Sequence, residues 1–190
     1  MNLASTIRTK RLVLIPATVE MLVHDRSDRR GLSRLLDAAV PAAWPPPLLD
    51  EETISQFIRM KEDGSDPNFC SWYWVRADRA GEGRTLIGCG GTGSSSGTPD
   101  AVMIGYSVLD EFQNQGYATE AIRGIAGEVF SWPGIRKIIA TTYPDLKPSI
   151  RVLEKVGFVP ACRKEQGKGM GEGTRVYTLD SPPKKDASEG

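Results

Sequence analysis

Apolar positions along the chain follow two periods, which predict strands and helices. Runs rich in β-branched and aromatic residues, which favour strands, occur at 7–16, 69–75, 85–87, 103–109, 137–143 and 175–179. Apolar residues three or four positions apart, which form one face of a helix, occur at 118–130, at 148–156 and within 18–60. The pattern is that of an α+β protein.

The clearest local feature is a glycine-bearing turn between the strand predicted at 103–109 and the helix that begins near Ala118. The first N–H groups of a helix have no intrahelical acceptor, and they attract anions. Gly116 lacks the Cβ atom that would keep a phosphate from approaching these groups. The order strand, turn, helix therefore predicts a loop that binds a diphosphate.

The residues of this loop resemble the signature of a known enzyme family. The Q-x-x-G-x-A spacing that begins at Gln113 is similar to the Q/R-x-x-G-x-G/A motif of the GNAT superfamily of acyl-CoA-dependent N-acyltransferases. The letters GYATEA at 116–121 resemble its ribosomal-protein N-acetyltransferase branch. Residues 148–158 resemble the superfamily's closing helix, which ends in Gly-Phe, and residues 7–16 resemble the first strand of the branch. The resemblance covers residues 7–179.

The resemblance implies a GNAT-like α+β fold and a site for acetyl-CoA. The fold would be a mixed, mostly antiparallel sheet of six or seven strands with helices on both faces, in a single domain spanning residues 1–180. The coenzyme A pyrophosphate would bind the loop, and the pantetheine arm would insert between the strands that end near Val108 and Tyr143. The residues implied to bind the cofactor are Val108, Leu109, Gln113, Asn114, Gln115, Gly116, Tyr117, Ala118 and Thr119.

Two residues are candidates for the catalytic chemistry. Ser149 matches the position at which the ribosomal-protein branch carries a serine proposed to protonate the leaving thiolate. A serine at a helix start also commonly bonds the local backbone, so both roles are open. Tyr143, at the end of the preceding predicted strand, is the second candidate, although a buried tyrosine more often serves packing.

Three positions depart from the family pattern. Leu153 stands where many members carry a tyrosine as the thiolate acid, and Met103 stands where some carry a glutamate as general base. Leu146 replaces an asparagine that caps the closing helix, so Asp145 is the candidate cap. His24, the only histidine in the chain, is expected on the surface of the amino-terminal helical region. No strong general base is apparent.

The implied reaction is transfer of an acetyl group from acetyl-CoA to a primary amine by direct attack in a ternary complex. At pH 7 an α-amine is roughly 10% neutral and a lysine amine only about 0.04%, a difference of about 3 kcal/mol. Without a strong base, we therefore expect a peptide or protein amino terminus as the acceptor. A small-molecule amine is the alternative, for which Asp50, Glu51 and Glu52 would form an acidic groove. A catalytically silent acyl-CoA-binding module is a third reading.

The region 18–60 is predicted to be helical with interruptions. Thr18 is expected to cap a first helix, Gly31 to interrupt the helical pattern, and Asp50 to place a carboxylate at the first turn of a later helix. The proline-rich stretch 41–47 cannot stay helical. Trp44, within it, either packs beneath a loop or contacts the acceptor, because this region walls the acceptor groove in the family that the chain resembles.

Two glycine-rich stretches are interpreted as connections. Residues 88–93 match G-x-G-x-x-G after the strand predicted at 85–87, but no helix follows. We therefore predict a hairpin loop rather than a dinucleotide fingerprint. The alternate glycines from Gly167 to Gly173 predict a flexible connection between two terminal strands, and Lys164 and Lys168 are expected to lie on that solvated loop.

The composition argues against several classes of protein. Lys plus Arg and Asp plus Glu number 24 each, so no chain-wide basic excess favours nucleic acid. The three cysteines include no C-x-x-C pair, so neither a metal site nor a disulfide framework is indicated, and a reduced cytoplasmic location is expected. No stretch approaches the roughly 20 apolar residues of a membrane span. We expect a monomer or homodimer with a disordered tail at 181–190.

Overall fold

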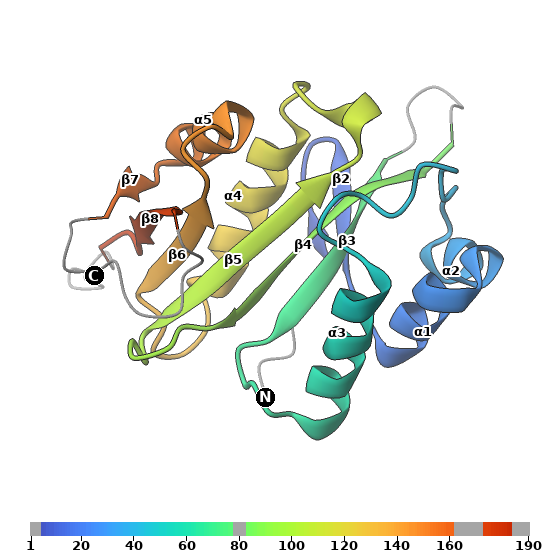
Figure 1. Ribbon diagram of the computed structural model, residues 1–190, viewed down its shortest axis with the longest axis horizontal. Helices are drawn as coiled ribbons and strands as arrows, with labels where there is room; N and C mark the ends of the chain where they lie inside the picture. The colour runs from blue at the N-terminus through green and yellow to red at the C-terminus, as the bar shows by residue number, and fades with distance from the viewer. Residues whose placement is uncertain (1–4, 78–82, 162–172, 184–190) are drawn as a thin grey trace, which may run out of the picture.

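The computed structural model describes residues 5–77, 83–161 and 173–183, which form a sheet flanked by helices (Figure 1). In chain order the elements are β1 (Ile7–Arg8), β2 (Leu12–Pro16), α1 (Val19–Ser27), α2 (Arg29–Leu36), α3 (Glu51–Asp63), β3 (Cys70–Arg76), β4 (Thr85–Ser94), β5 (Ala101–Val108), the 3-10 turn η1 (Asp110–Phe112), α4 (Tyr117–Val129), β6 (Lys137–Thr142), α5 (Lys147–Val156), β7 (Val159–Pro160) and β8 (Arg175–Asp180).

Within residues 5–77, 83–161 and 173–183, the sheet has eight strands in the order β1-β2-β3-β4-β5-β6-β8-β7. Among the described strands, β5 and β6 run parallel and the other neighbours run antiparallel. This confirms the expected mixed, mostly antiparallel fold, but the expected count of six or seven strands was too low. The strand predicted at 7–16 is a hairpin of β1 and β2, because the chain turns back where Thr9 N–H donates to Leu12 O (2.9 Å). The two-residue β7 was also not foreseen.

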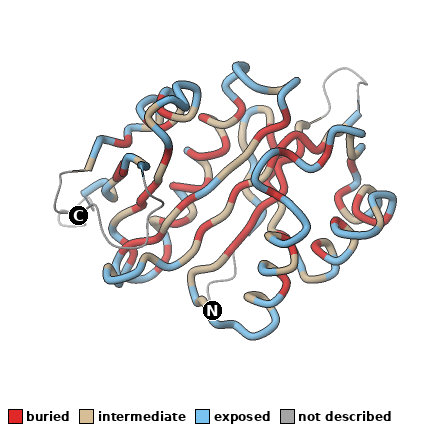
Figure 2. Tube along the Cα trace, in the orientation of Figure 1, coloured by how far each residue is buried: buried red, intermediate tan, exposed pale blue. Residues whose placement is uncertain are grey.

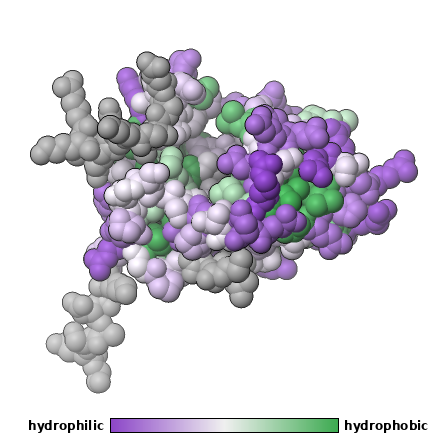
Figure 3. Space-filling view, turned by 60° about the horizontal axis from the view of Figure 1, so that its bottom comes forward, coloured by the Kyte–Doolittle hydropathy of each residue, from purple (hydrophilic) through white to green (hydrophobic). Residues whose placement is uncertain are grey.

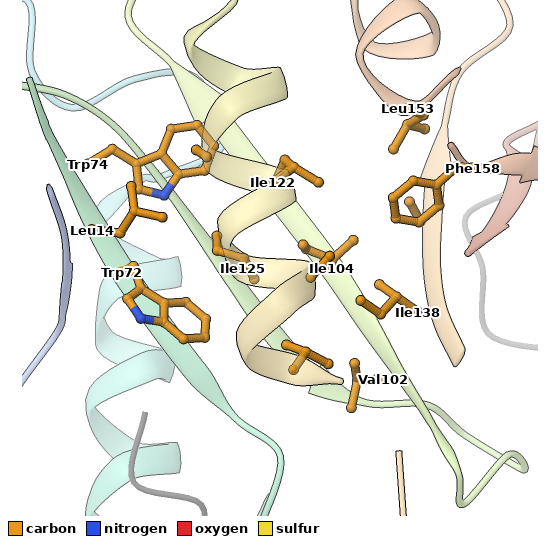
Figure 4. Close-up of a cluster of buried hydrophobic side chains, with 14 of the residues drawn as sticks. Leu14, Trp72, Trp74, Val102, Ile104, Ile122, Ile125, Ile138, Leu153 and Phe158 are labelled. Carbon is orange, nitrogen blue, oxygen red and sulfur yellow. The ribbon is translucent and has the colours of Figure 1, made fainter. Parts of the chain in front are cut away.

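Strand β3 explains how both faces of the sheet are covered. Its side chains alternate, so that Trp72 and Trp74 pack on the side of α4 and α5, while Tyr73 and Val75 pack on the side of α1, α2 and α3. Figure 4 shows the first of these two cores, in which the two indoles lie beside Ile125 and its neighbours on α4. Figure 2 shows the buried residues concentrated along the central strands. Helices therefore cover both faces, as expected.

The glycines at 88–93 lie inside β4, so the prediction of a hairpin loop there was wrong. A Cβ atom at Gly90 would lie 2.6 Å from Cζ2 of Trp74, and one at Gly88 would lie 3.2 Å from Cε3 of the same ring. The Trp74 indole on β3 therefore covers the neighbouring strand where that strand has no side chains. The G-x-G-x-x-G pattern reflects close packing within the sheet rather than a nucleotide-binding turn.

The amino-terminal helices follow most of the predicted signals. Thr18 and Asp50 cap α1 and α3 by accepting backbone N–H bonds, as predicted. The interruption falls at Asp28, which caps α2, rather than at Gly31. A Cβ atom at Gly31 would lie 2.1 Å from Nδ1 of His24. Glycine at this position therefore allows α1 and α2 to pack closely, and it does not end a helix.

Two predictions concern residues that the structure covers only in part. Apart from Gly173, the predicted glycine connection lies outside the described residues, together with Lys164 and Lys168. Of the predicted tail, Ser181–Pro183 are described, and the N–H of Ser181 donates to the carbonyl of Arg136 (2.8 Å). The disordered tail stays a prediction.

Candidate active site

The loop between β5 and α4 presents the start of a helix to its surroundings. Gly116 precedes α4 with φ of 81°, a left-handed conformation that glycine adopts without strain. The first bond of the α4 ladder runs from Glu120 N–H to Gly116 O (3.1 Å). The N–H groups of Tyr117, Ala118 and Thr119 precede this bond, so they are directed out of the helix end. The positive end of the helix dipole lies at the same place, which suits a phosphate.

The two glutamines of this loop brace it from within. Nε2 of Gln113 donates to Val108 O (3.0 Å) and to a carboxylate oxygen of Asp110 (2.8 Å). Nε2 of Gln115 donates to Glu111 O (2.9 Å). These bonds hold the loop across the 3-10 turn η1. The glutamines therefore shape the loop, and the backbone groups of the α4 start are left to meet a ligand.

Arg11, from the β1–β2 turn, supports the loop from the other side. Its Nε donates to Oε2 of Glu120 (2.6 Å), and one of its terminal nitrogens donates to Gln115 O (2.9 Å). Its guanidinium also lies 4.3 Å from the centre of the Tyr117 ring. Burial raises the pKa of Glu120, but hydrogen bonds from Thr9 and Arg11 outweigh it and hold the pKa below its usual range. This ion pair fixes the turn against α4.

A groove with several basic residues continues from this loop. It has a volume of about 620 Å³ and includes backbone and side chains of the β1–β2 turn, α4 and α5. Four of its lining residues are cationic: Lys10, Arg11, Arg123 and Lys155. Arg123 also donates to the carbonyl of Lys155, which ties α4 to α5. Because Gly116 and Thr119 line the same groove, these cations lie near the helix start.

Strands β5 and β6 separate next to this loop. Their pairing runs from Ala101 with Lys137 to Ile104 with Ala140 and stops there, so Gly105–Val108 extend beyond it. The splay implied by the resemblance is thus present. Hydrogen-bonding direction alternates along an antiparallel strand, and Leu109 N–H donates back to Ile87 O (2.9 Å).

The alternation places the N–H groups of Tyr106 and Val108 on the open edge of β5. The carbonyl of Val108 is already held by Gln113, which leaves the Val108 N–H on that edge. Both backbone groups of Leu109 are engaged within the chain, because its carbonyl accepts from Phe112 N–H (2.9 Å). Val108, rather than Leu109, therefore has its backbone N–H on the open edge.

Ser149 lies close to a tyrosine that sequence reasoning did not single out. The hydroxyl of Tyr106, on β5, lies 3.2 Å from Oγ of Ser149 and 3.4 Å from its carbonyl oxygen. The Tyr106 ring stacks on Trp74, with centroids 6.3 Å apart. Burial raises the pKa of Tyr106, and the bond with Ser149 offsets this only in part. The structure thus joins two hydroxyl groups beside the open edge.

The other expected residues around α5 differ in their placement. Tyr143 is half exposed (51%) rather than buried. Leu153 is buried in the core, in the same cluster as Ile104 and Val108 of β5. Pro148 lies in the first turn and Gly157, with φ of 114°, ends the helix, as predicted. The side chain of Asp145 does not cap α5, because the cap position is Leu146 and no side-chain bond is made there.

A mainly apolar pocket of about 440 Å³ lies on the other side of the open edge from the basic groove. It is built from α3, the loop before α3, and strands β3, β4 and β5, and it reaches Gly105, Tyr106 and Thr141 at the point where β5 and β6 separate. Its apolar lining residues include Ala17, Leu22, Leu48, Leu49, Phe57, Met60, Phe69, Trp72, Tyr73, Cys89, Met103 and Ile104. The pocket and the basic groove thus lie near the same splay.

Trp44 lies beneath the loop and takes no part in lining this pocket. It is 1% exposed, and its indole N–H donates to Oδ1 of Asp25 (2.6 Å), whose Oδ2 accepts from the Tyr73 hydroxyl (2.8 Å). Burial raises the pKa of Asp25, and the two hydrogen bonds lower it in part. The packing alternative for Trp44 is therefore correct, and contact with an acceptor is not.

Comparison with known proteins decides the family. The chain matches the acetyltransferase (GNAT) domain family over residues 11–159. The chain belongs to this family. Over 55 residues the acetyltransferase is 41% identical to the uncharacterized N-acetyltransferase YnaD of Bacillus subtilis, and that match covers 29% of this chain and 32% of the relative.

Solved structures share the fold of this acetyltransferase. A GNAT-family acetyltransferase from Bacillus anthracis has a TM-score of 0.59 at 21% identity, covering 93% of this chain and 98% of its own. RimL, a ribosomal L7/L12 alpha-N-protein acetyltransferase solved with coenzyme A, has a TM-score of 0.62 at 15% identity, covering 93% and 98%. Family membership confirms the resemblance and the expected class, an acetyl-CoA-dependent acetyltransferase.

Other chemistry finds little support in the part of the acetyltransferase that the structure describes. Burial raises the pKa values of the Cys70 and Cys89 thiols to about 12, so neither forms a thiolate readily. Among the described residues, no group of three or more His, Cys, Asp or Glu side chains is arranged to hold a metal ion. No helix within the described ranges is long and apolar enough to cross a membrane.

Proposed function

We propose that this acetyltransferase moves an acetyl group from acetyl-CoA to the amino terminus of a peptide or protein, by direct attack in a ternary complex. One observation carries the proposal: the open stretch of β5, Gly105–Val108, lies between the phosphate-binding loop and the apolar pocket. A thioester held along this edge meets an amine whose carrier occupies the pocket. Such positioning supplies much of the catalysis in a transfer between two bound substrates.

The donor side is assigned from the helix start outward. The backbone N–H groups at the start of α4 hold the pyrophosphate, and the N–H of Val108 bonds the pantetheine arm. Lys10, Arg123 and Lys155, in the basic groove beside the loop, attract the remaining phosphate charge of the cofactor. The residues proposed to form the loop site are Gln113, Asn114, Gln115, Gly116, Tyr117, Ala118 and Thr119, with the two glutamines shaping it.

The acid for the leaving group is proposed to be Ser149. The amine nitrogen attacks the thioester carbonyl carbon, the C–S bond breaks, and the thiolate takes a proton from the Ser149 hydroxyl. Burial raises the pKa of Tyr106, so it begins the step as a protonated phenol. From 3.2 Å away it returns a proton to Ser149, and it regains a proton from water, which receives the one that the amine loses. Tyr143, exposed at the end of β6, stays a second candidate for the acid. The proton lost by the amine passes to water.

The choice of amine follows from its acidity. No carboxylate or histidine lines the pocket among the residues that the structure describes, so the acceptor must arrive neutral. An α-amine does so far more often than a lysine amine at neutral pH. RimL, an alpha-N-protein acetyltransferase that shares this fold, supports this choice. The acidic groove needed for a polyamine is not supported, because Asp50, Glu51 and Glu52 do not line the pocket.

The proposal is tested by binding and turnover on the same protein. Calorimetry measures acetyl-CoA binding. A thiol-release assay then compares the rates for two peptides. The first has a free amino terminus, and the second has the same sequence with a blocked amino terminus and an internal lysine. For the free terminus, kcat/KM should rise about tenfold per pH unit and level off near the amine pKa of about 7.7–8.0.

Three outcomes separate the alternatives. Faster acetylation of the internal lysine contradicts the amino-terminal acceptor. Tight acetyl-CoA binding without turnover on any amine identifies a silent acyl-CoA-binding module. No acetyl-CoA binding by the folded protein removes the basis of both readings.

A further inference from the structure

The lining of the acceptor pocket is uncharged. Among the described residues, no Asp, Glu, Lys, Arg or His side chain lines it. The floor is nearly bare, because Gly91, Gly93 and Gly105 contribute no side chains. A Cβ atom at Gly105 would meet no heavy atom within 4 Å, so free space begins directly above the open edge of β5. The wall opposite is formed by Phe57 and Met60 of α3.

The edge of this pocket carries an exposed leucine in an unfavourable conformation. Leu48 lines the pocket, is 85% exposed and has φ of 71°, a region that a bulky side chain rarely adopts. The next residue holds it there, because Leu49 is buried and its N–H donates to Pro46 O (3.2 Å). Strained residues persist where the surroundings fix them, often at sites that bind a ligand. Figure 3 shows one mainly hydrophilic face of the molecule, on which hydrophobic residues gather in a few areas.

One buried hydroxyl in the pocket lacks a partner. Ser71, on β3, is 6% exposed, lines the pocket, and its Oγ makes no hydrogen bond with the described residues. A buried hydroxyl without a partner is unfavourable unless a ligand supplies one. Ser71 thus marks one unsatisfied polar contact in a mainly apolar site, whose other polar lining residues include Gln56, Thr92, Ser107 and Thr141.

From these three observations, we propose that the acceptor carries a bulky apolar side chain next to its amine. The side chain fills the pocket between Met60 and Gly105, Leu48 covers it, and Ser71 bonds a polar atom of the acceptor's backbone. The volume of 440 Å³ falls in the usual range for sites that bind small ligands, about 300–1,000 Å³. A charged side chain would lose its hydration here without gaining a partner. The inference rests on the proposed amino-terminal acetylation and narrows its substrate class.

The test uses the whole protein and a series of peptides that differ only in the first residue. Leucine, methionine and phenylalanine peptides should show kcat/KM at least about tenfold above those of aspartate and lysine peptides, which corresponds to burial of one apolar side chain. Phenylalaninamide and 2-phenylethylamine form a second arm. If the kcat/KM values of these two amines equal that of the phenylalanine peptide, the pocket accepts an apolar small amine rather than a polypeptide.

A variant pair assigns the preference to this pocket. Met60→Glu places a carboxylate in the wall, so it should lower kcat/KM for the leucine peptide and raise it for the lysine peptide. Val23→Glu adds the same charge at an exposed position of α1 that does not line the pocket, and it should leave the ratio unchanged. An equal or greater rate with charged first residues overturns the inference.

A second measurement does not need turnover. In the presence of coenzyme A, calorimetry compares the acetylated leucine and aspartate peptides, which are products of the proposed reaction. Tighter binding of the leucine product supports the inference, and equal or absent binding contradicts it. Since coenzyme A binding is measured in the same titrations, failure of the donor site is distinguished from failure of the acceptor pocket.

Discussion

The two regions that meet at the open edge of β5 are built in opposite ways. The proposed donor side consists of backbone N–H groups at a helix start, with several cations beside it. The acceptor side is an uncharged pocket of side chains from several elements, among the described residues. The first suits a charged cofactor through a short continuous segment. The second suits an apolar group through residues that only the complete fold brings together.

The contrast separates what the two regions contribute to the reaction. A phosphate gains most of its binding energy from preorganised dipoles and charge, so changes in the donor loop should act on cofactor affinity. An apolar side chain gains its energy from area removed from water, so changes in the pocket should act on acceptor selection. Four sets of substitutions, each with its controls, test these contributions.

The largest effect is expected at the start of α4. In Gly116→Trp, the indole blocks the approach of the pyrophosphate to the helix, and acetyl-CoA affinity should fall by at least about 100-fold by calorimetry. Gly134→Trp is the matched control, because Gly134 has the same φ of 81° and no heavy atom within 4 Å of an added Cβ. Retained affinity in the Gly116 variant would place the cofactor elsewhere.

The next effect concerns the pair of hydroxyl groups between the two regions. Ser149→Ala should lower kcat by about 100-fold, as expected for loss of a general acid, with the dissociation constant of acetyl-CoA unchanged. Tyr106→Phe should lower kcat less, and combining both changes should add little to Ser149→Ala, since the two groups act in one relay. Ser149→Thr keeps the hydroxyl and should restore part of the rate. A purely structural serine would change stability and leave kcat intact.

A smaller effect is expected on the acceptor side. Gly105→Leu fills the space above β5, so KM for an amino-terminal peptide should rise about tenfold while acetyl-CoA binding persists. The open space around this glycine allows the fold to accept the side chain. Gly127→Leu, on α4, has the same open surroundings away from the pocket. If both variants keep the original KM, the pocket does not bind the acceptor.

The smallest effect concerns the ion pair that braces the donor loop. Glu120→Gln should lower the free energy of unfolding by about 1–3 kcal/mol at neutral pH, because charged hydrogen bonds to Arg11 are lost. The folded pKa of Glu120 lies below its ordinary value of 4.5, so its contribution is present above that pH and is lost as the pH falls below it. The difference between native protein and variant should therefore shrink in acid.

Denaturant titrations at several pH values measure this difference. Glu128→Gln removes the same charge from the same helix, where the Glu128 carboxylate accepts hydrogen bonds from the backbone and side chain of the exposed Ser5. It should cost less than about 0.5 kcal/mol. A constant difference across the pH range would mean that the charge of Glu120 is not what stabilises the contact.

The strand, the glycine turn and the helix start around Gly116 were predictable from sequence, because they lie within about 20 contiguous residues. That the N–H groups of this helix end bind the cofactor stays a prediction. Tyr106 and Arg11 were missed, because their roles depend on Ser149 and Glu120, far away in the sequence. The alternation of side chains along β5 could have predicted that Tyr106 lies on the face covered by α4. It could not have predicted the distance between Tyr106 and Ser149.

The proposed acceptor pocket and the glycines of β4 show more clearly what could not be predicted from the sequence. No periodicity in β4 could reveal that Trp74 lies over Gly90, so the segment read as a loop. Trp44 was ambiguous, because only its bond to the buried Asp25 places it in the core. Cytoplasmic location, oligomeric state and the single-domain boundary stay predictions.

The contact between Arg11 and Glu120 joins residues 109 positions apart. During synthesis, the first hairpin is therefore complete long before its partner on α4 leaves the ribosome. Contacts of such sequence separation form late and slow down folding. The loop before α4 is braced by this contact only when both of its ends are present, so a truncated chain lacks this support for the proposed pyrophosphate site. Acetyl-CoA that binds only the completed fold would then stabilise it by mass action, and the cell's supply of this metabolite would influence how much acetyltransferase persists.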